Sequence, residues 1–243
     1  FIESLQVTIN LMVVVVTIQI SLGTLLAILL STKTKITSYF TLPFMIPVFI
    51  SPVVVGLIWK FMFNYDLGIL NYLFEIVGIG AVNWLGTPQN AFWSVVIIDT
   101  WQWTPLIILI LYTGVKSLPH DIKEQAIVDG ANKIQNFLFI TLPLLRWYIL
   151  VAILIRITDA WKMFDYISSL TGGGPGYSSQ TLSYYVYLRG FRRFELGEAA
   201  AVSWIMLIII YLICFILVKI FKPKATTNKP QPQTKKQNKP TRM

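Results

Sequence analysis

Five charged residues lie inside long apolar segments, where charge is costly. Asp99 lies in one apolar run, and a later run contains Arg156, Asp159, Lys162 and Asp165. A charge at the centre of a bilayer costs roughly 2.5 to 3.5 kcal/mol even on lenient scales, so such residues line a polar pathway or neutralise one another. The four later residues recur at intervals of three, which brings opposite charges together along one helix stripe. Mutual neutralisation is therefore our interpretation for Arg156 and Lys162.

The segment DTWQWTP, residues 99 to 105, combines hydrogen-bonding groups with flat apolar rings. Its residues Asp99, Gln102 and Trp103 fall within about one helical turn. Sugar recognition needs directional donors and acceptors for hydroxyls, and apolar faces for the C–H surface of the ring. The segment therefore suits a sugar pathway, whereas Trp101 and Trp103 suit packing or the membrane interface equally well.

Motifs for enzyme chemistry are missing from the sequence. It contains no GxxxxGK[ST] phosphate loop, no GxSxG elbow and no HExxH pair. The single histidine, His120, has no second ligand for a metal site, and the single cysteine, Cys214, allows no intrachain disulfide. The glycine-rich segment TGGGPG at 171–176 predicts a tight turn where a helix leaves the membrane. A membrane-embedded enzyme that uses the two aspartates near residue 160 remains an alternative, but no nucleophile supports it.

The composition indicates whether the chain folds in water or in a membrane. Of the 243 residues, 55% are hydrophobic and 13% are charged, and the mean hydropathy is +0.65. Such a chain is too apolar for a soluble domain, so we predict an all-α polytopic membrane protein. A bilayer core takes about 20 apolar residues per helix. Five runs meet this length, at residues 7–30, 39–63, 91–112, 147–170 and 199–221.

The second predicted span contains Pro43, Pro47 and Pro52 in its first half. Proline removes a helix hydrogen bond and clashes with the preceding turn. We therefore expect this span to kink or to begin as a broken helix, which is tolerable when neighbouring helices satisfy the freed carbonyls.

Lysine and arginine in the loops predict the orientation of the spans. The loop after the first span and the loop at 113–146 are basic, and the tail from Lys219 holds eight basic residues, so we place all three in the cytoplasm. The loop between the second and third spans holds Asp66 and Glu75 with no Lys or Arg, as an external loop should. Arg189, Arg192 and Arg193 disagree, because they fall on the external side.

Five spans with a cytoplasmic C-terminus place the first residue outside the cell. We therefore expect a further segment, in the form of one more spanning helix, before Phe1. The tail at 222–243 is rich in Pro, Lys and Asn and is predicted to be a disordered cytoplasmic segment that fixes topology. Its charge also suits contact with anionic lipid headgroups.

Residues 117–143 form a polar insert between two apolar runs. Pro119 suits a first helical turn, Asp121 suits the positive helix end, and Gly130 suits a left-handed cap. These signals predict one short helix ending near Asp129. A second helix from about Asn132 is expected to place Ile134, Phe137 and Leu138 on one side and to stop at Leu142-Pro143.

This insert resembles the cytoplasmic signature of membrane subunits of binding-protein-dependent ATP-binding-cassette (ABC) importers. The signature reads EAA, three residues, G, nine residues, I-x-L-P. The chain matches it with Glu124, Gln125, Ala126, Gly130, Ile140, Leu142 and Pro143. Gln125 replaces the first alanine, a mild change because both residues favour helix. The phrases NWLG, DTWQWTP, MFDYISSLTGGGPG and LGEAAAVS are similar to the carbohydrate branch, represented by the larger membrane subunit of maltose transporters.

The resemblance implies a type I ABC importer transmembrane domain over residues 1–221, in the cytoplasmic membrane. Its expected partners are a second permease subunit, an ABC ATPase dimer and an extracytoplasmic sugar-binding protein, with no nucleic acid. ATP and magnesium would be bound by the ATPase, and this chain would hold no cofactor or metal. The helix from Glu124 to Asp129 would be the coupling helix that docks on the ATPase.

The resemblance also implies a set of residues along the sugar pathway. The positions that match are Asp99, Gln102 and Trp103 on the third span, and Asp159, Ala160 and Met163 on the fourth. Several identities differ from those of the maltose-type subunit, so the sugar itself does not carry over. An importer of glycerol phosphate, a polyol or an amino acid remains the alternative.

Overall fold

The computed structural model describes residues 1–31, 44–118, 125 and 130–221. Within these ranges every regular element is helical. The predicted tail at 222–243 and His120 lie outside the described residues, as does every residue of the predicted coupling helix from Glu124 to Asp129 except Gln125.

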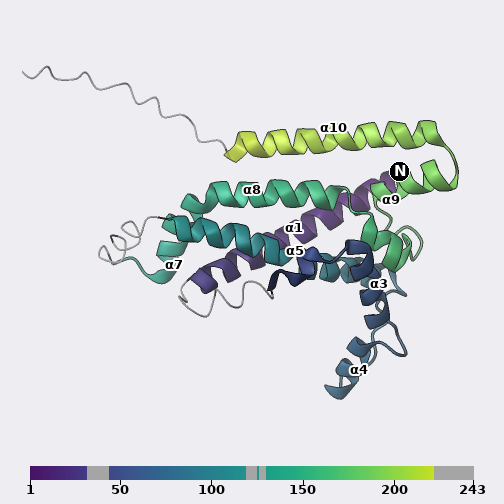
Figure 1. The fold of residues 1–243 in the computed structure, drawn as a ribbon, viewed down its shortest axis with the longest axis horizontal. Coiled ribbons are helices and arrows are strands. Elements are labelled where there is room, and N and C mark those ends of the chain that lie inside the picture. The colour runs from purple at the N-terminus through teal and green to yellow at the C-terminus, as the bar shows by residue number, and fades with distance from the viewer. Residues whose placement is uncertain (32–43, 119–124, 126–129, 222–243) are drawn as a thin grey trace, which may run out of the picture.

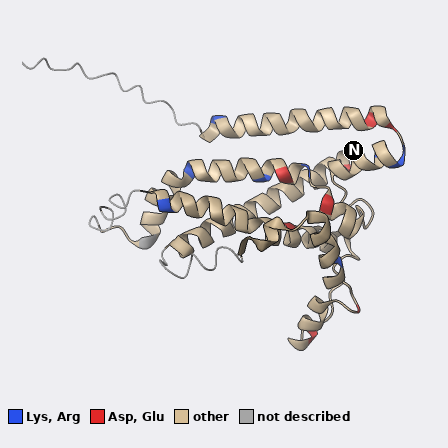
Figure 2. Cartoon of the chain, viewed as in Figure 1, with Lys and Arg blue, Asp and Glu red and all other residues tan. Residues whose placement is uncertain are grey.

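In the part of the chain that the structure describes, four helices are long and apolar enough to cross a membrane. They are α1 (Ile2–Ser31), α5 (Pro88–Ser117), the segment Ile134–Trp161, which includes α8 (Leu142–Trp161), and α10 (Leu196–Phe221). Each contains most of one of the spans predicted near 7–30, 91–112, 147–170 and 199–221. Figure 2 shows these helices almost wholly in tan, with most charged residues near their ends. Hydropathy therefore predicts the positions of α1, α5 and α10 to within a few residues.

The second predicted span, 39–63, is not one continuous helix in the described residues. A short helical segment at 44–49 gives way to a break at Ile50 and Ser51, after which α3 (Pro52–Met62) begins. Pro52 opens α3, where its missing N–H costs nothing. The expected broken helix is therefore confirmed from residue 44 onward, and α3 alone is shorter than a bilayer span.

The core of the bundle is formed where α1, α5 and α8 lie side by side (Figure 1). Leu11 and Val15 of α1 pack with Val95 and Ile98 of α5 in one fully buried cluster. Gly23 lets the two helices approach closely, because a Cβ there would lie 2.5 Å from Cγ2 of Ile107. Small residues at such crossings are typical of helices packed in membranes.

The fourth predicted span differs from the structure at both ends. Pro143 does not stop the preceding helix: α7 (Lys133–Asn136) continues through a π-helical turn, η1 (Phe137–Thr141), into α8. In that turn the N–H of Leu142 bonds five residues back, to Phe137, and the wider turn accommodates proline in the first turn of α8. At the other end α8 stops at Trp161 rather than near 170, and a separate π-helical turn, η2 (Ile167–Thr171), follows.

Short helices and turns form the connections that the sequence predicts to be external. The loop after α3 contains α4 (Ile69–Ile76), which Figure 1 shows extending sideways from the bundle. The TGGGPG segment after η2 forms the predicted turn, with positive φ at three of its glycines. It leads into α9 (Leu182–Tyr187), then η3 (Leu188–Arg192), then α10.

The described ends of the long helices sort into two groups (Figure 1). The C-terminal ends of α1, α5 and α10 lie at the same end of the bundle as α7. The last turns of α5 and α10 carry Lys116 and Lys219. α4 and the turn between α9 and α10 lie toward the opposite end. The helix termini next to the segments predicted to be cytoplasmic therefore lie at the opposite end of the bundle from the loops predicted to be external.

Candidate functional site

A buried ion pair joins two of the long helices at the centre of the bundle. Arg156 of α8 is 0% exposed, and its Nη2 lies 2.6 Å from Oδ2 of Asp99 on α5, which is 2% exposed. Gln19 of α1 completes the group: its Nε2 donates to the Asp99 carboxylate at 2.8 Å, and its Oε1 accepts from Nε of Arg156 at 2.7 Å. The hydrogen bonds and opposite charges together offset the cost of removing these groups from water.

Of the ion pairs predicted between charged residues three positions apart on the fourth span, only some form. Asp159 lies 3.9 Å from Nη1 of Arg156 and 3.2 Å from Nζ of Lys162. The shortest ionic contact of Arg156 is instead with Asp99 on another helix. Lys162 and Asp165 form no ion pair among the described residues, because α8 ends at Trp161 and the two no longer share a helix face. The predicted pairing of Lys162 with Asp165 is therefore wrong.

A second polar chain links α5 to the broken second span. The indole Nε1–H of Trp103 donates to the Tyr166 hydroxyl at 3.1 Å, and that hydroxyl donates to Oε1 of Gln102. Nε2 of Gln102 then donates to the carbonyl of Ile50 at 2.7 Å. Ile50 lies at the helix break, so this bond satisfies a carbonyl that the break leaves without a helical partner.

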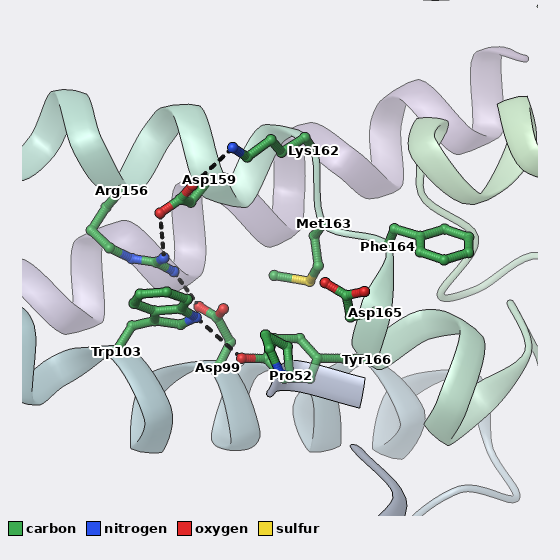
Figure 3. Close-up of a pocket in the computed structure, with 10 residues that line it drawn as sticks. All are labelled: Pro52, Asp99, Trp103, Arg156, Asp159, Lys162, Met163, Phe164, Asp165 and Tyr166. Carbon is green, nitrogen blue, oxygen red and sulfur yellow. Dashed lines mark hydrogen bonds and ion pairs between the residues drawn. The ribbon is translucent and has the colours of Figure 1, made fainter. Parts of the chain in front are cut away.

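These two groups border one cavity of about 180 Å³ (Figure 3). The Trp103 ring forms part of its wall and stacks near the Arg156 guanidinium, whose Cζ lies 5.1 Å from the ring centroid. The cavity combines carboxylates, cations, an aromatic ring and a thioether. The complete lining is Pro52, Asp99, Trp103, Arg156, Asp159, Lys162, Met163, Phe164, Asp165 and Tyr166.

Four of the six predicted pathway residues line this cavity: Asp99, Trp103, Asp159 and Met163. Gln102 and Ala160 are buried outside the lining. Gln102 is hydrogen-bonded to Tyr166, which lines the cavity, and to the Ile50 carbonyl. Pro52 and Tyr166 were missed, because only the fold brings the helix break and η2 to the cavity; a tyrosine among apolar residues carries no signal of its own.

The predicted coupling insert is described only in part. Gln125 is helical and exposed, and Gly130 has φ +81°, which confirms the left-handed conformation expected of it. Asn132 and Gln135 cap the next helix reciprocally: each side chain accepts a hydrogen bond from the other's backbone N–H, at 2.8 and 2.9 Å. Ile140 lies in η1, and Leu142 and Pro143 open α8. No described contact tests a role in coupling.

The three arginines that oppose the predicted orientation lie in the turn between α9 and α10. Nη1 of Arg189 lies 2.6 Å from Glu195 and 3.3 Å from Glu198. The hydrogen bond from Arg189 lowers the pKa of Glu195. The Tyr185 hydroxyl donates to Glu198, and this bond raises the pKa of Tyr185. Arg189 is therefore neutralised locally, which reduces its weight as a topology signal.

The fold and the cavity together define a class: a polytopic helical membrane protein with a polar site between its spanning helices. The described residues contain no cluster of three or more His, Cys, Asp or Glu suited to a metal. Ionisable groups at membrane depth that face a cavity are typical of solute pathways.

The chain belongs to the family described as "Binding-protein-dependent transport system inner membrane component", whose sequence profile matches residues 19–227. Members are membrane subunits of transporters and not enzymes, and they work with partner subunits. A probable ABC transporter permease of Sinorhizobium fredii, y4oQ, is 40% identical over 210 residues, covering 86% of this chain and 68% of that protein. The trehalose/maltose transport system permease MalF of Thermococcus litoralis is 34% identical over 217 residues, covering 88% and 72%.

Solved structures agree on the fold. A chain of a bacterial alginate ABC transporter, in complex with its alginate pentasaccharide-bound periplasmic protein, superposes with a TM-score of 0.81 at 21% identity. The match covers 90% of this chain and 77% of that chain. Together with the family match, this fold confirms the type I importer architecture expected from the sequence.

Proposed function

We propose that this chain is one of two permease subunits of an ATP-driven sugar importer and forms half of the translocation pathway. The observation that carries the proposal is the cavity between α5, α8 and the broken span. It offers hydrogen-bonding groups beside the flat ring of Trp103, a combination suited to a sugar. Asp99, Trp103, Asp159 and Met163 contribute directly, and Gln102 positions Tyr166.

The relatives support a sugar as the solute. The Thermococcus litoralis relative is named for trehalose and maltose, and a further relative in Halalkalibacterium halodurans is named for arabinooligosaccharides. The partners of this chain would be a second permease, an ABC ATPase dimer and an external solute-binding protein. Importers of glycerol phosphate, polyols or amino acids remain the alternative.

We further propose that residues 117–143 couple the chain to the ATPase. Pairing of Glu124 with a basic residue of the ATPase would anchor the helix that ends near Asp129. The capped helix α7 continues through the π-helical turn η1 into α8. A displacement of the insert would therefore be transmitted to the cavity along one continuous helical segment. This role requires the end of the bundle with Ser31, Ser117 and Phe221, and with it the C-terminus, to face the cytoplasm.

Uptake by membrane vesicles tests the proposal. Vesicles that contain this chain, a second permease and an ATPase should accumulate labelled sugar when the binding protein is outside and ATP is inside. A ligand screen on the binding protein identifies which sugar to label. Accumulation of an amino acid or a polyol phosphate, with no accumulation of any sugar, would overturn the choice of solute. Failure of the chain to co-purify with a permease and an ATPase would overturn the assembly.

A further inference from the structure

The charges that line the cavity do not cancel. Three carboxylates face it, those of Asp99, Asp159 and Asp165, against the two cations Arg156 and Lys162, for a formal net charge of −1. Asp99 is matched by Arg156 at 2.6 Å, and Asp159 bridges Arg156 and Lys162. Asp165 has no ionic partner among the described residues. The unbalanced charge of the cavity therefore resides on Asp165.

The Asp165 carboxylate is placed for contact with a ligand. Figure 3 shows it beside the Met163 thioether, on the cavity side of the segment that joins α8 to η2. The described hydrogen bonds to Asp165 come from Ser168 and Ser169 and end on its backbone carbonyl, so they leave the carboxylate oxygens unused. A carboxylate in this state is a strong hydrogen-bond acceptor for hydroxyl groups.

Arg156 supplies an unused donor in the same cavity. Its Nε and Nη2 are occupied by Gln19 and Asp99, but its buried Nη1 has no hydrogen-bond partner. Nη1 lies 3.9 Å from Asp159, within ionic reach but beyond hydrogen-bond distance. A buried donor without a partner is costly, so a ligand oxygen that accepts from Nη1 would be stabilised.

We propose that Asp165 and Arg156 select the solute, and that the cavity accepts an uncharged sugar ring while rejecting anionic sugars such as uronates and sugar phosphates. This inference rests on the proposed function and names the class of sugar. The hydroxyls of a neutral sugar can donate to the Asp165 carboxylate and accept from Nη1 of Arg156. An anionic group would meet Asp165 without gaining a free cation, because the charge of Arg156 is taken up by Asp99, and Lys162 is 66% exposed and paired with Asp159.

Binding of matched sugars to the assembled transporter tests this inference. The complex of this chain with its second permease and ATPase, held in nanodiscs without the binding protein, is titrated by ligand-observed NMR. The probes are glucose with glucuronate, galactose with galacturonate, and mannose with mannuronate. We expect the neutral member of a pair to bind at least about tenfold more tightly, since one like charge nearby costs on this scale.

Variants assign the effect to Asp165. Asp165→Asn keeps the shape of the side chain and removes its charge, and Asp165→Lys reverses the charge. The ratio of the affinity for the neutral sugar to the affinity for its uronate should therefore fall from wild type to Asp165→Asn and again to Asp165→Lys. Asp66→Lys in the loop before α4 changes the net charge equally and should leave the ratio unchanged. Uronates that bind wild type as well as neutral sugars, or an Asp165→Asn ratio equal to that of wild type, would overturn the inference. Absence of binding by any sugar, in a complex whose vesicles accumulate sugar, overturns the site and leaves the proposed function standing.

Discussion

Asp99 and Arg156 come from different helices and form a buried ion pair 2.6 Å long, with Gln19 of a third helix bonded to both. Removal of one charge leaves the other buried without its partner, which typically costs about 3 to 5 kcal/mol. We expect Asp99→Leu and Arg156→Met each to lower the thermal stability of the purified complex strongly. The double variant should recover most of the loss, because replacing a whole buried pair with apolar residues is often nearly neutral.

A loss in the double variant equal to the sum of the two single losses would show that Asp99 and Arg156 contribute independently and not as a pair. Asp159→Asn provides a matched control on the same helix. Its carboxylate is 31% exposed and lies 3.9 Å from Arg156, so its removal should cost much less than that of Asp99.

Gln102 fixes the helix break to the bundle through its bond to the Ile50 carbonyl. Gln102→Leu keeps the bulk of the side chain but leaves that carbonyl and the Tyr166 hydroxyl without this partner, at a cost of about 1 to 3 kcal/mol. Hydrogen exchange should therefore speed up at the amides of residues 50–56. Gln89→Leu, at the exposed start of α5, is the control and should leave these amides unchanged; equal protection in both variants contradicts the assigned role.

Helix positions could be predicted because length and hydropathy decide them: α1, α5 and α10 were located to within a few residues. The pairing of Asp99 with Arg156 could not be predicted, because the two residues lie 57 positions apart and meet only through the relative register of α5 and α8. The continuation through Pro143 was missed for a different reason. A π-helical turn depends on local packing, and no sequence pattern announces it.

The turn between α9 and α10 should respond to acid. Its hydrogen bond from Arg189 lowers the pKa of Glu195 below the ordinary glutamate value of about 4.3. The stabilisation from this pair is therefore fully present above about pH 4.3 and is lost as the pH falls through the lowered pKa of Glu195. Hydrogen exchange of residues 188–198, corrected for intrinsic rates, should accelerate only below that range. Glu195→Gln should remove the step, and a step that persists in this variant would contradict the assignment to Glu195.

Substitutions in the polar insert at 117–143 should uncouple transport from ATP hydrolysis. Gly130 has φ +81°, which proline cannot adopt because its ring holds φ near −65°. Gly130→Pro should therefore distort the turn that precedes α7, and Glu124→Lys should repel a basic partner on the ATPase. Both variants should insert and assemble, yet lose sugar uptake and the stimulation of ATP hydrolysis by loaded binding protein. Asn132→Ala, which removes only a helix cap worth about 1 kcal/mol, should retain most uptake. Normal uptake and normal ATPase stimulation in both Gly130→Pro and Glu124→Lys would exclude this insert as the route by which ATP-driven motion reaches α8.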